Sequence, residues 1–309
     1  MKTLIVGAGA VGGYFGGRLL QAGRDVTFLV RPQRAAALAK SGLRIRSPHG
    51  DAHFPTPTTV TADQLTAPFD LVIVSCKAQD LLSAVDTFAP AVGPDTAVLP
   101  LLNGMRHIDI LNTRFGKPRV LGGQCVISVT RDSEGGILQL TEMQFLSFGE
   151  QDGSRSERAK AILPFLGNAG FDVAMSDNIL LEMWSKWVFI ATGAGITCLM
   201  RASVGDIVEA GATDLVVTLL EEGRAIAAAE GFAISEDSFS RARAMFTQPR
   251  STLTASMLRD IENHAPTEGD YILGDLLERG RKHDLKSPLL RIAYAHVKAY
   301  EARRARESA

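Results

Sequence analysis

The stretch MKTLIVGAGAVGGYFGGRLLQAGRDVTFLVR, residues 1–31, decides the fold of this chain. The apolar run Leu4–Val6 has the length of a buried strand, and Val11–Leu20 has the character of a helix that Gly23 ends. A second apolar run follows at Val26–Val30. Strand, glycine turn, helix and strand in this order predict the opening unit of a dinucleotide-binding domain.

Three glycines with the spacing G-x-G-x-x-G stand between the first strand and the first helix. We expect Gly7 to permit a tight turn, Gly9 to let a pyrophosphate approach the backbone, and Gly12 to let the helix pack close to the strand. The first N–H groups of the helix and its dipole then favour phosphates. The alternative is a glycine-rich turn without a ligand, but the position between strand and helix favours a cofactor site.

The end of the second strand indicates which cofactor is bound. A unit that binds NAD carries Asp or Glu there, whereas this chain has Val30 followed by Arg31, with Arg34 one helical turn later. A guanidinium can hold a 2′-phosphate through two parallel hydrogen bonds. We therefore expect NADP (NADPH) rather than NAD, and a solvated surface arginine is the alternative.

Composition excludes several classes of protein. The chain has 309 residues, 46% hydrophobic and 22% charged, with a net charge of −1, which is typical of a globular protein with two domains and gives no reason to expect nucleic acid or a membrane as partner. The distant Cys76, Cys125 and Cys198 and the six histidines show no metal-ligand spacing, so we expect no metal and cysteines that pack in the core in a reducing compartment. Gly7 interrupts the N-terminal apolar run, which excludes a signal peptide, and Trp187–Met200 is too short to span a bilayer. These features predict a cytoplasmic protein.

Apolar runs and turn signals alternate through the first half of the chain. Helices are expected at Pro32–Ser41 and Asp80–Phe88. Further strands are expected at Leu43–Arg46, Leu71–Ser75, Ala97–Leu102, Val120–Val129, Ile137–Leu140 and Phe145–Phe148. This alternation predicts a Rossmann-type doubly wound sheet over residues 1–175.

Helical periodicity replaces the strand-like runs near Asp177. Residues 176–309 are therefore expected to form an all-helical domain that carries the substrate site, in a cleft beside the cofactor domain. Its helices are predicted at about 178–199, 205–231, 251–263, 268–283 and 287–304.

In open α/β sheets ligands bind beyond the carboxyl ends of the strands. Lys77 follows the expected strand at Leu71–Ser75, where it could contact phosphate, ribose or a substrate anion, or simply be an exposed lysine. Asn103 follows the strand at Ala97–Leu102, where it could bind a nicotinamide amide or a substrate oxygen. The pair Asn103-Gly104 is equally a plain turn signal, so both interpretations stay open.

The helix at 178–199 carries a lysine on its less apolar side. Trp184, Trp187, Val188 and Ala191 follow helical spacing and predict a buried stripe, which leaves Lys186 on the opposite side among few charged neighbours. Partial desolvation would lower the pKa of this lysine and suit it to donate a proton near neutral pH. The alternative is a lysine whose ammonium group reaches solvent.

Two more polar residues of the second domain have open interpretations. Glu268 follows Ala265-Pro266-Thr267 at the expected start of a helix, where an acidic residue satisfies the dipole or takes part in catalysis. Ser256 is predicted in the middle of a helix, where serine needs solvent or a partner.

The chain resembles the ketopantoate reductases (2-dehydropantoate 2-reductases). The segments that carry the resemblance span most of the length, and the last three are the specific ones. They are GAGAVG at 7–12, Arg31, SCKA at 75–78, LNGM at 102–105, FGE at 148–150, LEMWSK at 181–186, SMLRDI at 256–261 and TEGDY at 267–271.

The resemblance implies NADPH-dependent reduction of 2-dehydropantoate to pantoate, a reaction of pantothenate biosynthesis. It implies that Lys186 donates the proton to the keto oxygen, and that Glu268 positions the substrate and assists this lysine. It further implies that Asn103 lies beside nicotinamide and substrate, and that Ser256 binds the substrate carboxylate. The cofactor contacts that it implies are Gly7, Gly9, Ala10, Val11, Gly12, Arg31, Lys77, Asn103 and Glu268.

This chain departs from the family pattern where two asparagines usually grip the substrate. Those positions, four and eight residues after Lys186, are Ile190 and Ala194. Each missing charge-assisted hydrogen bond would contribute ~1.5–3 kcal/mol. A reductase of a less polar keto acid or of an imine is therefore the alternative function, and a non-catalytic NADPH-binding protein is a third. The sequence leaves the oligomeric state open, with a homodimer as one option.

Overall fold

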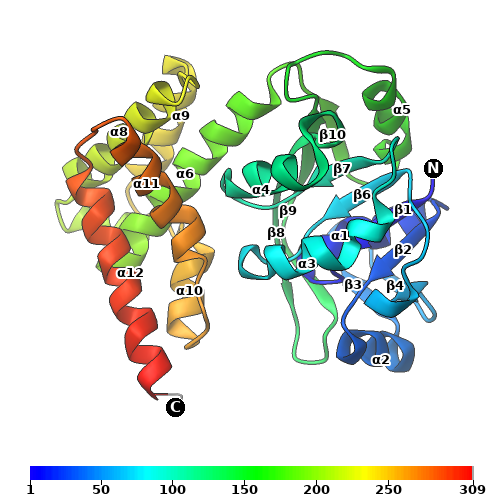
Figure 1. The fold of residues 1–309 in the computed structure, drawn as a ribbon. Coiled ribbons are helices and arrows are strands. Elements are labelled where there is room, and N and C mark those ends of the chain that lie inside the picture. The colour runs from blue at the N-terminus through cyan, green and yellow to red at the C-terminus, as the bar shows by residue number, and fades with distance from the viewer. Residues whose placement is uncertain (308–309) are drawn as a thin grey trace. The chain divides into compact units, whose positions relative to one another are not determined.

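The computed structural model describes residues 1–307, which form two compact units (Figure 1). The first unit comprises Met1–Leu102 and His107–Ile179. The second comprises Asn103–Arg106 and the chain from Leu180 onward. The short Asn103–Arg106 segment thus packs with helices that lie far away in the sequence.

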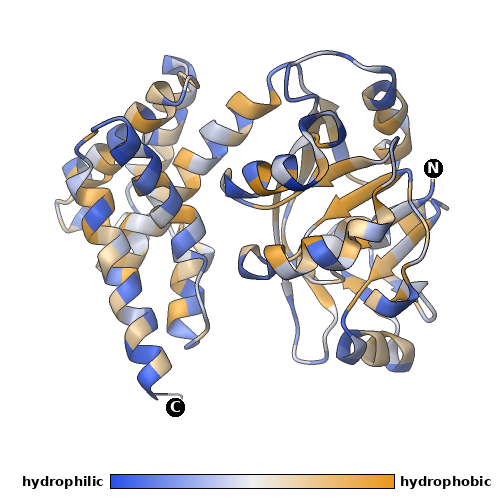
Figure 2. Cartoon of the chain, in the orientation of Figure 1, coloured by the Kyte–Doolittle hydropathy of each residue, from blue (hydrophilic) through white to orange (hydrophobic). Residues whose placement is uncertain are grey.

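The first unit contains the expected parallel sheet, which confirms the Rossmann-type fold. Its strands have the order β5-β2-β1-β6-β7, and all their pairings are parallel. Every residue of β1, β2, β6 and β7 is buried, and Figure 2 shows these strands as predominantly hydrophobic. The strands are β1 (Thr3–Val6), β2 (Val26–Leu29), β5 (Thr59–Val60), β6 (Leu71–Val74) and β7 (Ala97–Pro100), and the helices of this unit are α1 (Ala10–Gln21), α2 (Pro32–Ser41), α3 (Leu81–Phe88), α4 (Arg106–Phe115) and α5 (Glu157–Leu166).

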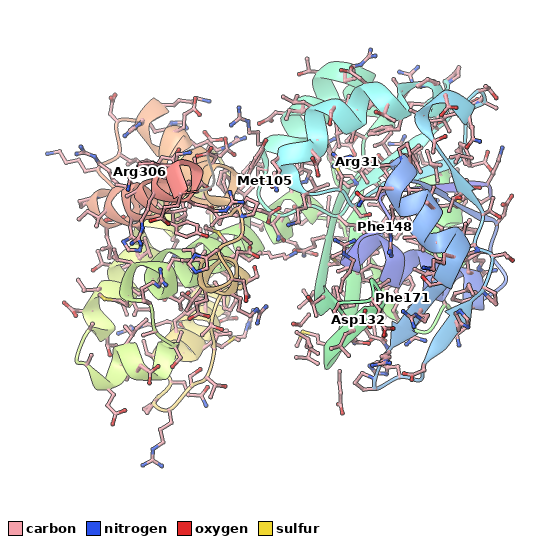
Figure 3. The ribbon with its side chains drawn as sticks, turned by 90° about the horizontal axis from the view of Figure 1, so that it is seen from below. Arg31, Met105, Asp132, Phe148, Phe171 and Arg306 are labelled. Carbon is pink, nitrogen blue, oxygen red and sulfur yellow. The ribbon has the colours of Figure 1, made fainter. Side chains whose placement is uncertain are left out.

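A second sheet in the same unit was not predicted. It has the order β10-β9-β3-β4, with β8 antiparallel to β9. Its core includes aromatic rings: Phe171 packs edge-on against Phe15 of α1, with ring centroids 4.9 Å apart, and Phe148 of β9 is fully buried (Phe148 and Phe171 are labelled in Figure 3). The strands are β3 (Leu43–Arg46), β4 (Ala52–Phe54), β8 (Gly122–Arg131), β9 (Ile137–Gly149) and β10 (Asp172–Met175).

The separate strands predicted at Ile137–Leu140 and Phe145–Phe148 are one strand, β9. Its exposed residues 140–143 resemble a turn in hydropathy. They stay extended because β8 pairs with β9 on both sides of an irregularity between Ile127 and Val129. Backbone pairing, rather than hydropathy, decides the conformation there.

The second unit is all helical, as predicted, but several boundaries differ. The helix expected at 205–231 is two helices, because Gly211 takes a φ of +79° between them. The helix expected at 251–263 begins only at Ser256, and α9 was not predicted. The helices are α6 (Ile179–Met200), α7 (Val204–Glu209), α8 (Thr213–Ala229), α9 (Glu236–Phe246), α10 (Ser256–Glu262), the π-helical turn η5 (Asp270–Gly274), α11 (Asp275–Lys282) and α12 (Pro288–Glu307).

Helix α6 is the hydrophobic centre of the second unit. Its 22 residues are long and apolar enough to cross a membrane by length and composition, but 61% of its most apolar window is buried inside the protein. The indole of Trp184 stacks on Phe232, with ring centroids 5.6 Å apart. These contacts are those of a core helix.

The cysteines only partly match the expected core positions. Cys125 and Cys198 are buried, and burial raises the pKa of the Cys198 thiol to about 12. Cys76 is only partly buried, because it lies beyond the end of β6. Within residues 1–307 no group of three or more His, Cys, Asp or Glu side chains is placed to hold a metal ion.

Candidate cofactor and catalytic site

The glycine turn after β1 is tightly enclosed at two of its three glycines. Gly7 has a φ of +97°, a conformation that side chains other than glycine rarely adopt. A Cβ atom on Gly12 would lie 2.0 Å from Ser75 Oγ and 2.1 Å from the Gly7 carbonyl oxygen. Only glycine therefore lets the start of α1 approach the ends of β1 and β6 this closely.

Gly9 differs from its neighbours because nothing in the protein requires a glycine there. Its φ of −80° is open to any residue, and a Cβ atom would meet no heavy atom within 4 Å. The first turn of α1, which begins at Ala10 and Val11, has no side-chain cap and no acidic residue. An open backbone beside uncapped N–H groups fits a bound pyrophosphate, so the residues present fit a dinucleotide.

The predicted cofactor-side cations lie beyond the ends of two strands. Arg31 follows β2, and its side chain is 72% exposed (labelled in Figure 3). Its Nη2 donates to Asp80 Oδ1 at 2.7 Å. Lys77 is exposed and directly precedes the short helical turn Ala78–Asp80. Asp80 was predicted only as the start of a helix, although an acidic residue close after the end of β6 also indicates a functional position.

Arg34 supports the glycine turn from α2. Its Nε donates to the carbonyl oxygen of Ala8 at 3.1 Å, and its buried Nη2 has no hydrogen-bond partner in the described part of the chain. Burial lowers the pKa of Arg34, and the positive charge of Arg131 lowers it further. Both effects destabilise the positively charged form of Arg34. A nearby anion would stabilise this form, so the site favours one.

In the second unit the predicted buried stripe of α6 is confirmed. Trp184, Trp187, Val188 and Ala191 are each no more than 2% exposed. Lys186 is half-buried on the other side of the helix, where Ile190 one turn later is also half-buried.

Trp187 joins three segments that are distant in sequence. Its Nε1 donates to the carbonyl oxygen of Ile272 at 3.0 Å. A Cβ atom on Gly104 would lie 3.7 Å from the same Nε1 and 3.2 Å from the carbonyl oxygen of Tyr271. Gly104 has a φ of +83°, so its backbone conformation favours glycine, and its Cβ position lies in contact distance of the indole.

The three joined segments each carry a predicted site residue. Lys186 precedes Trp187 on α6, and Asn103, which is half-buried, precedes Gly104. Glu268 is half-buried and accepts hydrogen bonds at its backbone oxygen from the N–H groups of Tyr271 and Ile272, at 3.0 and 2.9 Å. The fold thus brings the segments of all three predicted residues to one indole ring.

The backbone next to Glu268 is unusual. Residues Asp270–Gly274 form a π-helical turn, a feature found frequently at functional sites. The guanidinium of Arg106, next to Met105 (labelled in Figure 3), lies 5.6 Å from the ring centre of Tyr271. Arg106 was not predicted as a site residue, because it belongs to no sequence motif.

Ser256 lies at a different place in its helix than predicted. Ser256 is the first residue of α10 and is exposed, rather than lying in the middle of a helix. The preceding residues 251–255, Ser-Thr-Leu-Thr-Ala, were included in the predicted helix but are not helical. Serine is well tolerated at a helix start, so no special partner is needed to explain it.

Comparison with known proteins gives matches over nearly the whole chain. The family model described as ketopantoate reductase PanE/ApbA matches residues 3–153, and the model of the C-terminal part of the same family matches residues 178–301. An uncharacterised oxidoreductase, YkpB, from Bacillus subtilis is 39% identical over 308 residues, covering 98% of this chain and 99% of the relative.

Two solved structures share the whole fold. The crystal structure of 2-dehydropantoate 2-reductase from Methylococcus capsulatus is 29% identical with a TM-score of 0.87, and the match covers 98% of both chains. A D-mandelate dehydrogenase, solved with NADH and anilino(oxo)acetate, has a TM-score of 0.88 at 24% identity, with 99% of this chain and 100% of that chain covered.

Proposed function

Since this chain belongs to the ketopantoate reductase family, whose members are oxidoreductases that act on CH–OH groups and bind NADH or NADPH, we propose that it reduces a small 2-keto acid with NADPH. The leading substrate is 2-dehydropantoate, with pantoate as product. The observation that carries the proposal is the convergence at Trp187, which joins the segments of Lys186, Asn103 and Glu268.

In this proposal each residue has a defined task. A dinucleotide bound at the glycine turn would supply the hydride. Lys186 donates a proton to the keto oxygen, which offsets the negative charge that develops there. Glu268 orients the substrate and this ammonium group, Asn103 contributes an amide to nicotinamide and substrate, and Ser256 binds the substrate carboxylate.

The choice of NADPH over NADH is proposed from the charges of the first unit. Arg31 follows β2, where NAD-binding units carry an acidic residue, and its guanidinium is accessible. Lys77 adds a second exposed cation beyond β6. Both would attract the 2′-phosphate.

A less polar keto acid or an imine is the second candidate substrate. The positions that usually carry substrate-binding asparagines are Ile190, which is half-buried, and Ala194, which is only 1% exposed. Ala194 is therefore a packing residue, whereas Ile190 offers an apolar surface one turn from Lys186.

The test is a substrate panel of 2-dehydropantoate, aryl 2-keto acids and cyclic imines. The purified protein is mixed with NADPH and each compound, and NADPH oxidation is measured by the loss of its absorbance. Turnover of 2-dehydropantoate with the highest kcat/KM supports the leading substrate, and preference for an aryl keto acid or imine supports the second. A protein that binds NADPH but turns over no member of the panel is a non-catalytic binding protein.

Three further features are proposed from the same identification. We propose a role in pantothenate biosynthesis, a cytoplasmic location and a homodimeric assembly. Chromatography coupled to light scattering tests the last, and restoration of growth without pantothenate in a reductase-deficient bacterium tests the first.

A further inference from the structure

The ion pair between Arg31 and Asp80 lies at the end of the sheet where the dinucleotide is proposed to bind. Arg31 follows β2 and Asp80 follows β6, and these two strands flank β1. The pair therefore joins the two sides of the strand that carries the glycine turn. The Asp80 carboxylate is therefore bound to Arg31, the cation expected to recognise the 2′-phosphate.

The Asp80 carboxylate pairs with Arg31 and does not cap a helix, although it stands at a helix start. Asp80 occupies the N-cap position of α3, where aspartate normally accepts a hydrogen bond from the helix backbone. It makes no such side-chain cap and bonds Arg31 Nη2 at 2.7 Å instead. The backbone N–H groups at the start of α3 are therefore not capped by this carboxylate.

The pair is also accessible to a competing anion. The side chains of Arg31 and Asp80 are 72% and 36% exposed, so the pair is hydrated and easily exchanged. A phosphate carries more charge and three acceptor oxygens, and can take the guanidinium from a single carboxylate. The displaced carboxylate would remain close to the phosphate and repel it.

We propose that Asp80 sets the ratio of NADPH to NADH affinity by competing with the 2′-phosphate for Arg31. This inference rests on the proposed binding of a dinucleotide at the glycine turn. Asp80 keeps Arg31 paired when no 2′-phosphate is present, and it weakens NADPH without a matching effect on NADH, which presents only a ribose hydroxyl there.

The test compares dissociation constants of NADPH and NADH by titration calorimetry, without any keto acid. Asp80→Asn should bind NADPH about three- to tenfold more tightly, as expected for one exposed charge close to a phosphate, and should bind NADH no more tightly. The gain should be smaller at high salt and smaller in an Arg31→Ala background.

Asp86→Asn is the matched control, because it removes the same charge from an exposed side chain of the same helix. It should leave the ratio of the two affinities within twofold of the wild type. An Asp80→Asn protein with an unchanged ratio, or with equal changes for both dinucleotides, overturns the inference. A wild type that binds neither dinucleotide overturns the proposed function as well, and thermal unfolding confirms that each variant is folded.

Discussion

Two arginine–carboxylate pairs, one in each unit, have similar geometry and opposite surroundings. Arg31 and Asp80 approach to 2.7 Å with side chains that are 72% and 36% exposed. Arg279 and Glu230 approach to 2.9 Å with side chains that are 12% and 17% exposed. The exposed pair can exchange one partner for a ligand, whereas loss of one partner from the buried pair leaves a charge in the protein interior.

The pair of Arg279 and Glu230 lies beside α6. The guanidinium of Arg279 also bonds Asp275 at 3.2 Å and lies 5.6 and 5.7 Å from the ring centres of Trp184 and Trp187. These rings form the buried stripe on the side of α6 opposite Lys186. Arg279 thus packs against the buried side of α6, whereas Lys186, the proposed proton donor, lies on the opposite side.

The largest expected effect is on catalysis and concerns Lys186, on the side of α6 opposite the rings that Arg279 contacts. Lys186→Ala should lower kcat by about 10²- to 10⁴-fold, the usual contribution of a general acid, with little change in the melting temperature. Lys282→Ala, which removes an exposed lysine at the end of α11, is the control and should keep full activity. A Lys186→Ala enzyme within a fewfold of the wild type would remove this residue from the proposed role.

The buried pair should show the reverse behaviour, in stability rather than in chemistry. Glu230→Gln should lower the free energy of unfolding by about 2–3 kcal/mol, because Arg279 then loses the carboxylate that it pairs with at 2.9 Å. Arg224 and Glu236 form an exposed pair in the same unit, and Glu236→Gln should cost less than ~1 kcal/mol. Urea denaturation measures both, and equal losses would contradict the contrast.

The carboxylate of Glu230 should also make the stability of the protein depend on pH. Burial opposes ionisation of Glu230, but hydrogen bonds from Arg279 and His283 outweigh it and hold the pKa of this carboxyl below its ordinary value. Its contribution is therefore complete above the unfolded pKa of about 4.3 and is lost as the pH falls through the lower folded value. The difference in melting temperature between wild type and Glu230→Gln should shrink as the pH is lowered below about 5. A difference that is constant with pH would contradict this assignment.

Two glycines of the first unit offer a matched pair of substitutions. Gly12→Ala should destabilise the protein by about 1–3 kcal/mol, because its Cβ would overlap Ser75 and the Gly7 carbonyl. Gly9→Ala should leave stability unchanged or raise it by ~0.4–1 kcal/mol, since its backbone is ordinary and its surroundings are open. It should nevertheless weaken dinucleotide binding. Thermal unfolding with and without NADPH distinguishes the two, and a destabilised Gly9→Ala would show that protein packing needs that glycine.

The smallest expected effect concerns the exposed pair. Arg31→Ala should weaken NADPH about tenfold relative to NADH, because it removes one charged hydrogen-bond partner of the 2′-phosphate at a hydrated site. Arg155, which forms an exposed pair with Asp177, provides the control substitution Arg155→Ala. Equal losses for the two dinucleotides in the Arg31 variant would contradict the NADPH assignment.

Local patterns in the sequence predicted the parallel sheet and the core of the second unit. The spacing of Gly7, Gly9 and Gly12 and the stripe around Trp184 and Trp187 follow from strand and helix periodicity, which is read over a few residues. The split of the helix at Gly211 and the late start of α10 were missed, because such breaks depend on the packing of the whole unit.

The sequence by itself determined the glycine turn, the absence of an acidic residue directly after β2, and a half-polar side of α6 around Lys186. Only the tertiary structure decided that Asp80 pairs with Arg31, that Gly104 and Ile272 meet at Trp187, and that a second sheet continues through the polar part of β9. The physical reason is the distance along the sequence over which each interaction acts. Backbone conformation and hydrophobic periodicity are local properties, whereas ion pairs and close backbone contacts join residues that only the folded chain brings together.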